Sequence, residues 1–228
     1  MRPENAIIPL RRPDQVQLAE VTAVNDPDGL NRVEVQLHDL TGPEGQEGTL
    51  WARVATPFAG GDRGAFFIPD VGDEVLVTFV NGDPRYPIVI GSLWNGRDAA
   101  PETLGGSGDA VDRWSFVGKA GTRIAIVEEN QPTIHLETPG GAVAKITDQG
   151  GGKMTVNAGG ATVKIEPSGV TVETGAKISL SASTLEVSAG MVTVDAGFSS
   201  FSGVLQCDTL LATTVVASTY TPGAGNVW

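Results

Sequence analysis

Short apolar strands repeat through the second half of this chain, and they constrain its fold more than any other feature. Between Trp114 and Phe201, two apolar residues repeatedly flank one polar or small residue, and a small-residue turn follows. This alternation, rich in Val, Ile and Thr and bounded by Gly and Ser, predicts short, half-buried β-strands. The repeated phrases are residues 124–126, 134–136, 154–156, 163–165, 170–172, 178–180, 185–187 and 192–194.

Strands this narrow cannot bury their own apolar side chains. Side chains alternate between the two faces of a strand, so each phrase offers about two inward residues. Burying one Val, Ile or Leu is worth about 1.5–3 kcal/mol, but a face two residues wide cannot fold onto itself. The chain must coil into a solenoid or share its apolar faces with identical neighbours, and we favour an intertwined trimeric β-helix. Its predicted trimer core consists of Val163, Ile165, Val170, Val172, Ile178, Leu180, Leu185, Val187, Val192 and Val194.

A second all-β pattern precedes the repeat. Alternating segments at 17–24 and 32–37 flank a dense turn signal, which predicts a hairpin. Further alternating or apolar segments follow at 50–55, 74–80 and 87–93. Five or six short strands in about 80 residues, without a helix-period stretch, predict a small closed barrel of the OB type. The whole chain is therefore expected to be all-β.

Changes of composition divide the chain into segments. The prolines near the N-terminus oppose helix and favour an extended arm, and the Gly-rich stretch 105–108 favours a flexible linker. Closer apolar pairs at 210–211 and 215–216 distinguish the C-terminal end from the repeat. We predict an N-terminal arm at 1–17, an OB-fold domain at 18–97, a linker at 98–113, a β-helix spike at 114–205 and a tip segment at 206–228.

Charge and composition exclude several classes of partner and location. The formal net charge is -12, which disfavours a nucleic-acid partner because phosphate binding needs clustered cations. Cys207 is the single cysteine, so no disulfide can form within one chain. No apolar run approaches the roughly 18 residues of a transmembrane segment, and no secretion signal is visible. We expect synthesis and assembly in the cytoplasm.

No catalytic, cofactor or metal site stands out in the sequence. A Ser-His-Asp triad needs a histidine, and the chain has only His38 and His135. His135 lies inside a repeated phrase and should point away from the apolar core. The acidic residues of segment 70–73 surround a glycine and are typical of a turn rather than a cation site. We predict that the protein is not an enzyme and carries no cofactor.

Several linked motifs in the barrel region carry a resemblance to a known family. They are Trp-Ala-Arg-Val-Ala at 51–55, Phe-Ile-Pro at 67–69, Val-Gly-Asp-Glu-Val-Leu-Val at 71–77, Gly-Asp-Pro at 82–84 and Pro-Ile-Val-Ile-Gly-Ser-Leu at 87–93. Residues 19–97 thereby resemble the OB-domain signature of the spike family. That family contains the VgrG proteins of type VI secretion systems and the baseplate assembly protein V of contractile-tailed phages.

The resemblance implies a structural, trimeric central spike below the tail tube of a phage tail or contractile injection system. The OB domains would form a collar and the repeat a rigid needle that pierces the target membrane on contraction. The chain has no room for the large N-terminal hub domain of VgrG, so a separate hub protein is implied. Both histidines lie far from the C-terminus, which disfavours a His-x-His metal apex. A separate PAAR-like tip protein is implied instead, with contacts at Val215, Val216 and Trp228.

Two other interpretations remain open at this point. A trimeric fibre or adhesin would bind a cell-surface receptor through residues 220–228. A monomeric, single-chain solenoid would need coils of roughly 22–24 residues, which the spacing permits, but the carboxylate cluster of a glycosidase is missing. The mass in solution separates a trimer from a monomer.

Overall fold

The computed structural model describes residues 15–41 and 47–219, and it confirms an all-β chain. The side chains of residues 39–41 and 47 are not among those described. The chain divides into two units, residues 1–177 and 178–228, and each is described by itself. The predicted arm lies outside the described residues except for its last three positions.

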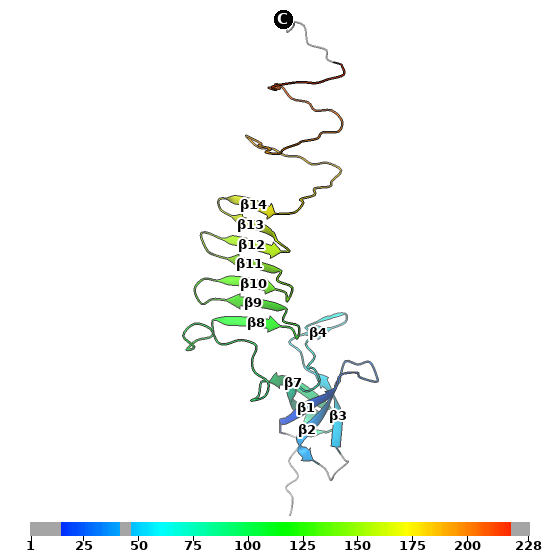
Figure 1. Ribbon diagram of the computed structural model, residues 1–228. Coiled ribbons are helices and arrows are strands. Elements are labelled where there is room, and N and C mark those ends of the chain that lie inside the picture. Colours follow the sequence, from blue (N-terminus) through cyan, green and yellow to red (C-terminus); the bar gives the residue numbers. More distant parts are fainter. Residues whose placement is uncertain (1–14, 42–46, 220–228) are drawn as a thin grey trace, which may run out of the picture. The chain divides into compact units, whose positions relative to one another are not determined.

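Five strands close into a barrel in the order β1-β2-β3-β7-β6 (Figure 1). β1 pairs antiparallel with both β2 and β6, whereas β3 and β7 are parallel. This closed five-stranded barrel confirms the predicted OB-like architecture. The strands are β1 (Gln17–Ala23), β2 (Val33–Thr41), β3 (Glu47–Val54), β6 (Glu74–Phe79) and β7 (Pro87–Leu93).

Alternating side chains fill the barrel interior. In β6, Val75, Val77 and Phe79 point inward, and the residues between them are half-buried. The other strands contribute mostly Val and Ala, because the inside of a five-stranded barrel has little room. The buried core is Ala19, Val21, Val33, Val35, Leu37, Ala52, Val75, Val77, Phe79 and Val89.

The loop between β1 and β2 is organised by one carboxylate. The side chain of Asp26 is only 3% exposed and accepts hydrogen bonds from the backbone N–H groups of Asp28, Leu30 and Arg32. Arg32 also donates from Nε and Nη2 at 2.9 and 2.7 Å. These hydrogen bonds lower the pKa of Asp26 far below its usual value. The acidic turn is therefore structural, as predicted from its composition.

Two short elements complete the barrel region. A two-stranded hairpin of β4 (Ala59–Gly60) and β5 (Arg63–Gly64) lies in the connection between β3 and β6. A short 3-10 turn, η1 (Val80–Gly82), connects β6 to β7.

The next seven strands form one antiparallel sheet in chain order (Figure 1). Each strand pairs with the next through a tight turn; Gly159 and Gly160 connect β12 to β13 with φ of 55° and 81°, which favours glycine at both positions. The strands of the predicted intertwined β-helix would pair between chains, whereas the ladders of β8–β14 lie within one chain. The strands are β8 (Arg113–Val117), β9 (Arg123–Val127), β10 (Thr133–Glu137), β11 (Val143–Thr147), β12 (Lys153–Ala158), β13 (Ala161–Glu166) and β14 (Gly169–Thr174).

The second unit has a different character. Its described residues, 178–219, contain no strand and no backbone-to-backbone hydrogen bond. Every side chain in this stretch is exposed in a single copy of the chain. The backbone is an extended chain with a bend every five to seven residues.

Candidate trimerisation surface

The register of the sheet β8–β14 places its apolar side chains on one face. Each strand contributes two of them, and cross-strand pairing aligns them in two columns. We call this surface the apolar face. One column is Trp114, Ile126, Ile134, Ile146, Met154, Ile165 and Val170, and the other is Phe116, Ile124, Leu136, Ala144, Val156, Val163 and Val172.

The apolar face is uncovered in a single chain. Trp114 at one end is 50% exposed, Ile134 in the middle 46% and Val170 at the other end 67%. Soluble monomers rarely expose contiguous apolar patches of more than a few hundred Å². A face seven strands long with two large side chains on almost every strand therefore requires another protein surface.

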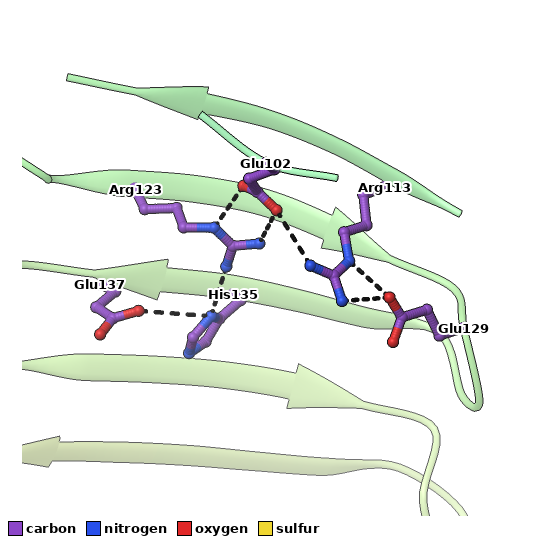
Figure 2. A network of polar contacts seen from close by, with 6 residues as sticks. All are labelled: Glu102, Arg113, Arg123, Glu129, His135 and Glu137. Atoms are coloured by element: carbon purple, nitrogen blue, oxygen red, sulfur yellow. Dashed lines mark hydrogen bonds and ion pairs between the residues drawn. The ribbon is translucent and has the colours of Figure 1, made fainter. Parts of the chain in front are cut away.

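The opposite face of the sheet is mostly polar, and it carries a cluster of charged residues (Figure 2). Glu102, from the segment before β8, accepts hydrogen bonds from Arg123 Nε at 2.6 Å and Nη2 at 2.8 Å. Arg113 Nη1 lies 3.7 Å from the second oxygen of Glu102, and Arg113 Nε donates to Glu129 at 2.7 Å. The hydrogen bonds from Arg123 lower the pKa of Glu102 to about 2. We call these four side chains the Glu102 clamp.

His135 lies at the edge of the Glu102 clamp. Its Nδ1 is 2.9 Å from Arg123 Nη1, and because a guanidinium only donates, Nδ1 accepts this hydrogen bond. Glu137 lies 4.0 Å away on the same strand. His135 is thus on the face opposite Ile134 and Leu136, as its place in the repeat predicts. It holds Arg123 in position through this hydrogen bond.

The Glu102 clamp attaches the predicted linker to the sheet. Within that segment, the N–H of Gly108 donates to the carbonyl of Gly105, and Asp112 donates to Leu104. The carbonyl of Asp112 in turn accepts from Glu128, after β9. Residues 105–108 thus form a closed turn within a segment that is anchored to the sheet.

The ten predicted core residues occupy two kinds of position. Val163, Ile165, Val170 and Val172 lie on the apolar face of the sheet. The other six, at 178–194, lie on the extended chain, where all are more than half exposed in one copy. Their burial between copies remains a prediction.

The core predicted from the sequence left out the part of the apolar face on β8–β12, and sequence reasoning also missed the Glu102 clamp. The residues of β8–β11 show the same alternation as the predicted core, so the signal was present and the predicted core began too late. The clamp left no comparable signal, because its members come from a loop, a turn and two strands. Of the predicted tip contacts, Val215 and Val216 are exposed, and Trp228 lies outside the described residues.

Neither a metal cluster nor a membrane-spanning helix is present in the described residues. No group of three His, Cys, Asp or Glu side chains lies close enough to hold a metal ion in residues 15–41 and 47–219. In the same residues, no helix has the length and apolar character needed to cross a membrane.

Two family models match the chain, one in the barrel and one in the C-terminal half. Residues 17–94 match the type VI secretion system/phage-baseplate injector OB domain, which is the region of the barrel. Residues 133–197 match the phage baseplate V C-terminal trimerisation domain, which spans most of the apolar face and the start of the extended chain. Together they cover more than half of the 228 residues.

Curated relatives agree with these matches. The chain is 33% identical over 96 residues to the type VI secretion system spike protein VgrG1a of Pseudomonas aeruginosa, covering 42% of this chain and 15% of the relative. It is 38% identical over 78 residues to the spike protein VgrG3 of Vibrio cholerae, covering 34% and 8%. The actin cross-linking toxin VgrG1 of V. cholerae is 39% identical over 59 residues, covering 26% and 5%. The chain thus spans only a small fraction of these relatives' length.

The barrel, the apolar face and the two matched domains lead to the same assignment. An OB-like barrel is followed by a β-rich region that carries a trimerisation domain, in the order that the sequence motifs predict. The chain belongs to the spike family of VgrG and phage baseplate V proteins.

Proposed function

We propose that this chain is the structural central spike of a contractile injection system or phage-tail baseplate. Three copies form a rigid needle that pierces the target membrane when the sheath contracts. The observation that carries the proposal is the coincidence of the matched trimerisation domain, 133–197, with uncovered apolar side chains.

Identical copies can cover the exposed apolar face of the isolated chain and can pair the free backbone groups of its extended end. The apolar faces of the β8–β14 sheets of three copies can cover one another. Each Val, Ile or Leu side chain that is buried in this way contributes about 1.5–3 kcal/mol. Along residues 178–219, backbone N–H and C=O groups have no backbone hydrogen-bond partner among the residues that the structure describes. Backbone polar groups that leave water must be paired, and extended segments of two further copies supply that pairing.

The predicted core follows from this arrangement. We propose that Val163, Ile165, Val170 and Val172 meet their counterparts across the axis through the sheets. The remaining six core residues, from Ile178 to Val194, do so through the extended chains. Rigidity then comes from a dry axis and from ladders that leave few free edges.

The remaining partners are proposed from the family. A separate hub protein would connect the barrels to the tail tube, and a PAAR-like tip protein would sit on the C-terminal end near Val215 and Val216. The formal charge of -12 argues against a nucleic-acid partner. Assembly would take place in the cytoplasm, where the other baseplate components are made.

The role is mechanical rather than enzymatic. The relative named as an actin cross-linking toxin shares only 59 residues with this chain, 5% of its own length. A match of that extent does not transfer a cross-linking activity. The arginine and carboxylate groups of the Glu102 clamp bind one another, which suits an anchor for the segment before β8.

Light scattering on the purified full chain tests the proposal directly. We expect a mass three times the 23.6 kDa of one copy, independent of concentration in the micromolar range. A mass of one copy, with the apolar face protected from solvent inside it, would refute the spike. Negative-stain images of the same sample should show narrow needles with a wider collar at one end.

A further inference from the structure

The interval between bends in the extended chain becomes shorter towards its end. Up to residue 197 the bends are seven residues apart; one six-residue step follows, and the later bends are five residues apart. At about 3.3 Å per residue, one side between bends shortens from about 23 Å to about 16 Å. The bends are at Ser183, Gly190, Gly197, Gly203, Asp208, Thr213 and Ser218.

We call the stretch of chain from one bend to the next a side. The seven-residue sides have a fixed composition on alternate positions. One set of positions reads large, large, alanine, and it contains the predicted core residues; the set between them is mostly polar. The alanine directly precedes the bend in each side. The three sides contribute Ile178, Leu180 and Ala182, then Leu185, Val187 and Ala189, then Val192, Val194 and Ala196.

The five-residue sides have the same alternate pattern, with one large residue instead of two before the small residue that precedes the bend. Counting back from each bend, the small position is taken by Cys207, Ala212 and Ala217 in turn. Two residues before it stand Leu205, Leu210 and Val215. A five-residue side thus differs from a seven-residue side by the loss of one large side chain from the alternate set. Cys207 stands directly before its bend, where the other five-residue sides and the seven-residue sides have alanine.

Side-chain exposure separates the same two sets. Leu205, Leu210 and Val215 are 60–65% exposed, within the 54–75% range of the predicted core residues of the seven-residue sides. Their apolar neighbours Val204, Leu211 and Val216 are 94–98% exposed. The five-residue sides thus continue the two-faced character of the sides before them.

We propose that the interface between copies continues past residue 197 to residue 217 as a narrower prism. Its partner is two further copies of this chain, so the inference rests on the trimer of residues 133–197. Each side of the narrow prism turns a single large side chain and a single small side chain towards the axis, because a side of about 16 Å leaves no room for two large ones. Cys207 and Val215 lie inside this prism. Of the two described tip contacts predicted from the sequence, only Val216 then remains outside, with Leu211, where a tip protein can contact them.

Thiol accessibility tests the inference on the full-length trimer. The native Cys207 should react with a water-soluble maleimide about tenfold or more slowly than after denaturation, because burial restricts access. In a Cys207→Ala background, Leu205→Cys and Leu210→Cys should be slow, and Val204→Cys and Leu211→Cys fast. All four should react equally fast in denaturant.

A control pair in the matched domain separates this inference from the trimer itself. Val192→Cys should react slowly and Thr193→Cys fast, since residue 192 belongs to the predicted core. Equal rates at 204 and 205, and at 210 and 211, with the control pair still different, would overturn the narrow prism and leave the spike intact. Equal rates in the control pair as well would overturn both.

Discussion

Replacing Val172 with Asp tests whether the apolar face of the sheet is buried between copies. Val172 lies on β14 next to Val163 of β13, and it is 53% exposed in one copy. A single chain could leave the new carboxylate in water at small cost. In a trimer, three carboxylates would be enclosed near the axis without partners.

The size of the penalty follows from the pKa of a buried carboxyl. Full burial raises that pKa by about 3–5, to about 7 or above. At pH 7 the penalty is therefore set by the gap between pH 7 and the unfolded pKa of about 3.9, which at about 1.36 kcal/mol per pKa unit is about 4 kcal/mol per copy. Three copies together lose about 12 kcal/mol, which is as large as the whole stability of many folded proteins, about 5–15 kcal/mol. We therefore expect no trimer at neutral pH.

The penalty has a defined pH dependence. The pKa of the buried Asp is raised above its unfolded value, so the loss is absent below about pH 4, where the carboxyl is protonated in both states. It grows as the pH rises towards the folded pKa. Light scattering and thermal unfolding of Val172→Asp at pH 7 and near pH 4 should therefore show partial recovery of the trimer under acid conditions.

A matched control lies one residue away. Thr171→Asp introduces the same group on the opposite face of the same strand, and it should leave the trimer and its melting temperature nearly unchanged. A soluble Val172→Asp trimer that melts like the parent at pH 7 would refute the burial of this face. Loss of the trimer in both variants would equally contradict the reasoning, because the effect would not depend on the face.

Two further perturbations test the Glu102 clamp and the sheet turns. Glu102→Gln should destabilise the segment before β8 by about 1–2 kcal/mol, seen as faster hydrogen exchange at 98–112, whereas the exposed Glu128→Gln should not. The folded pKa of Glu102 is about 2, below its unfolded value. The stability that Glu102 contributes is therefore present above about pH 4.5 and is lost as the pH falls towards 2. Hydrogen-exchange protection of 98–112 that stays unchanged over that pH range would contradict this role of Glu102. Gly160→Ala, at φ of 81° with open space around it, should cost about 1–2 kcal/mol in thermal unfolding, and Gly175→Ala much less; equal costs would show that backbone conformation is not the cause.

Alternation in the sequence was sufficient to predict the barrel strands and most strands of the sheet, but the phrases at 178–180, 185–187 and 192–194, predicted as strands as well, form no strand in a single chain. In β6 the pattern Glu-Val-Leu-Val-Thr-Phe assigns Val75, Val77 and Phe79 to one face, and the structure buries these three. The same logic gave the part of the apolar face on β13 and β14, since Val163 and Ile165 flank Lys164, whose side chain points the other way. A period of two reports which face a residue occupies.

Alternation does not report which strand lies beside which. The prediction of ladders between chains was wrong for β8–β14, because a tight turn such as that at 159–160 lets consecutive strands pair within one chain. The Glu102 clamp was unpredictable for a related reason. Glu102 reaches Arg123 across 21 residues, and that contact depends on a loop path that no local pattern encodes.

The absence of a backbone ladder in residues 178–219 dictates an order of assembly. The sheet of β8–β14 closes its hydrogen bonds within one chain, so each newly made copy can form it alone. In the proposed trimer, the extended end gains backbone partners only when three copies are already in register, so we expect it to pair last, beginning next to β14. Until then, this stretch offers unpaired backbone to proteases and to other extended chains, so a cell that makes the spike must bring three copies together quickly.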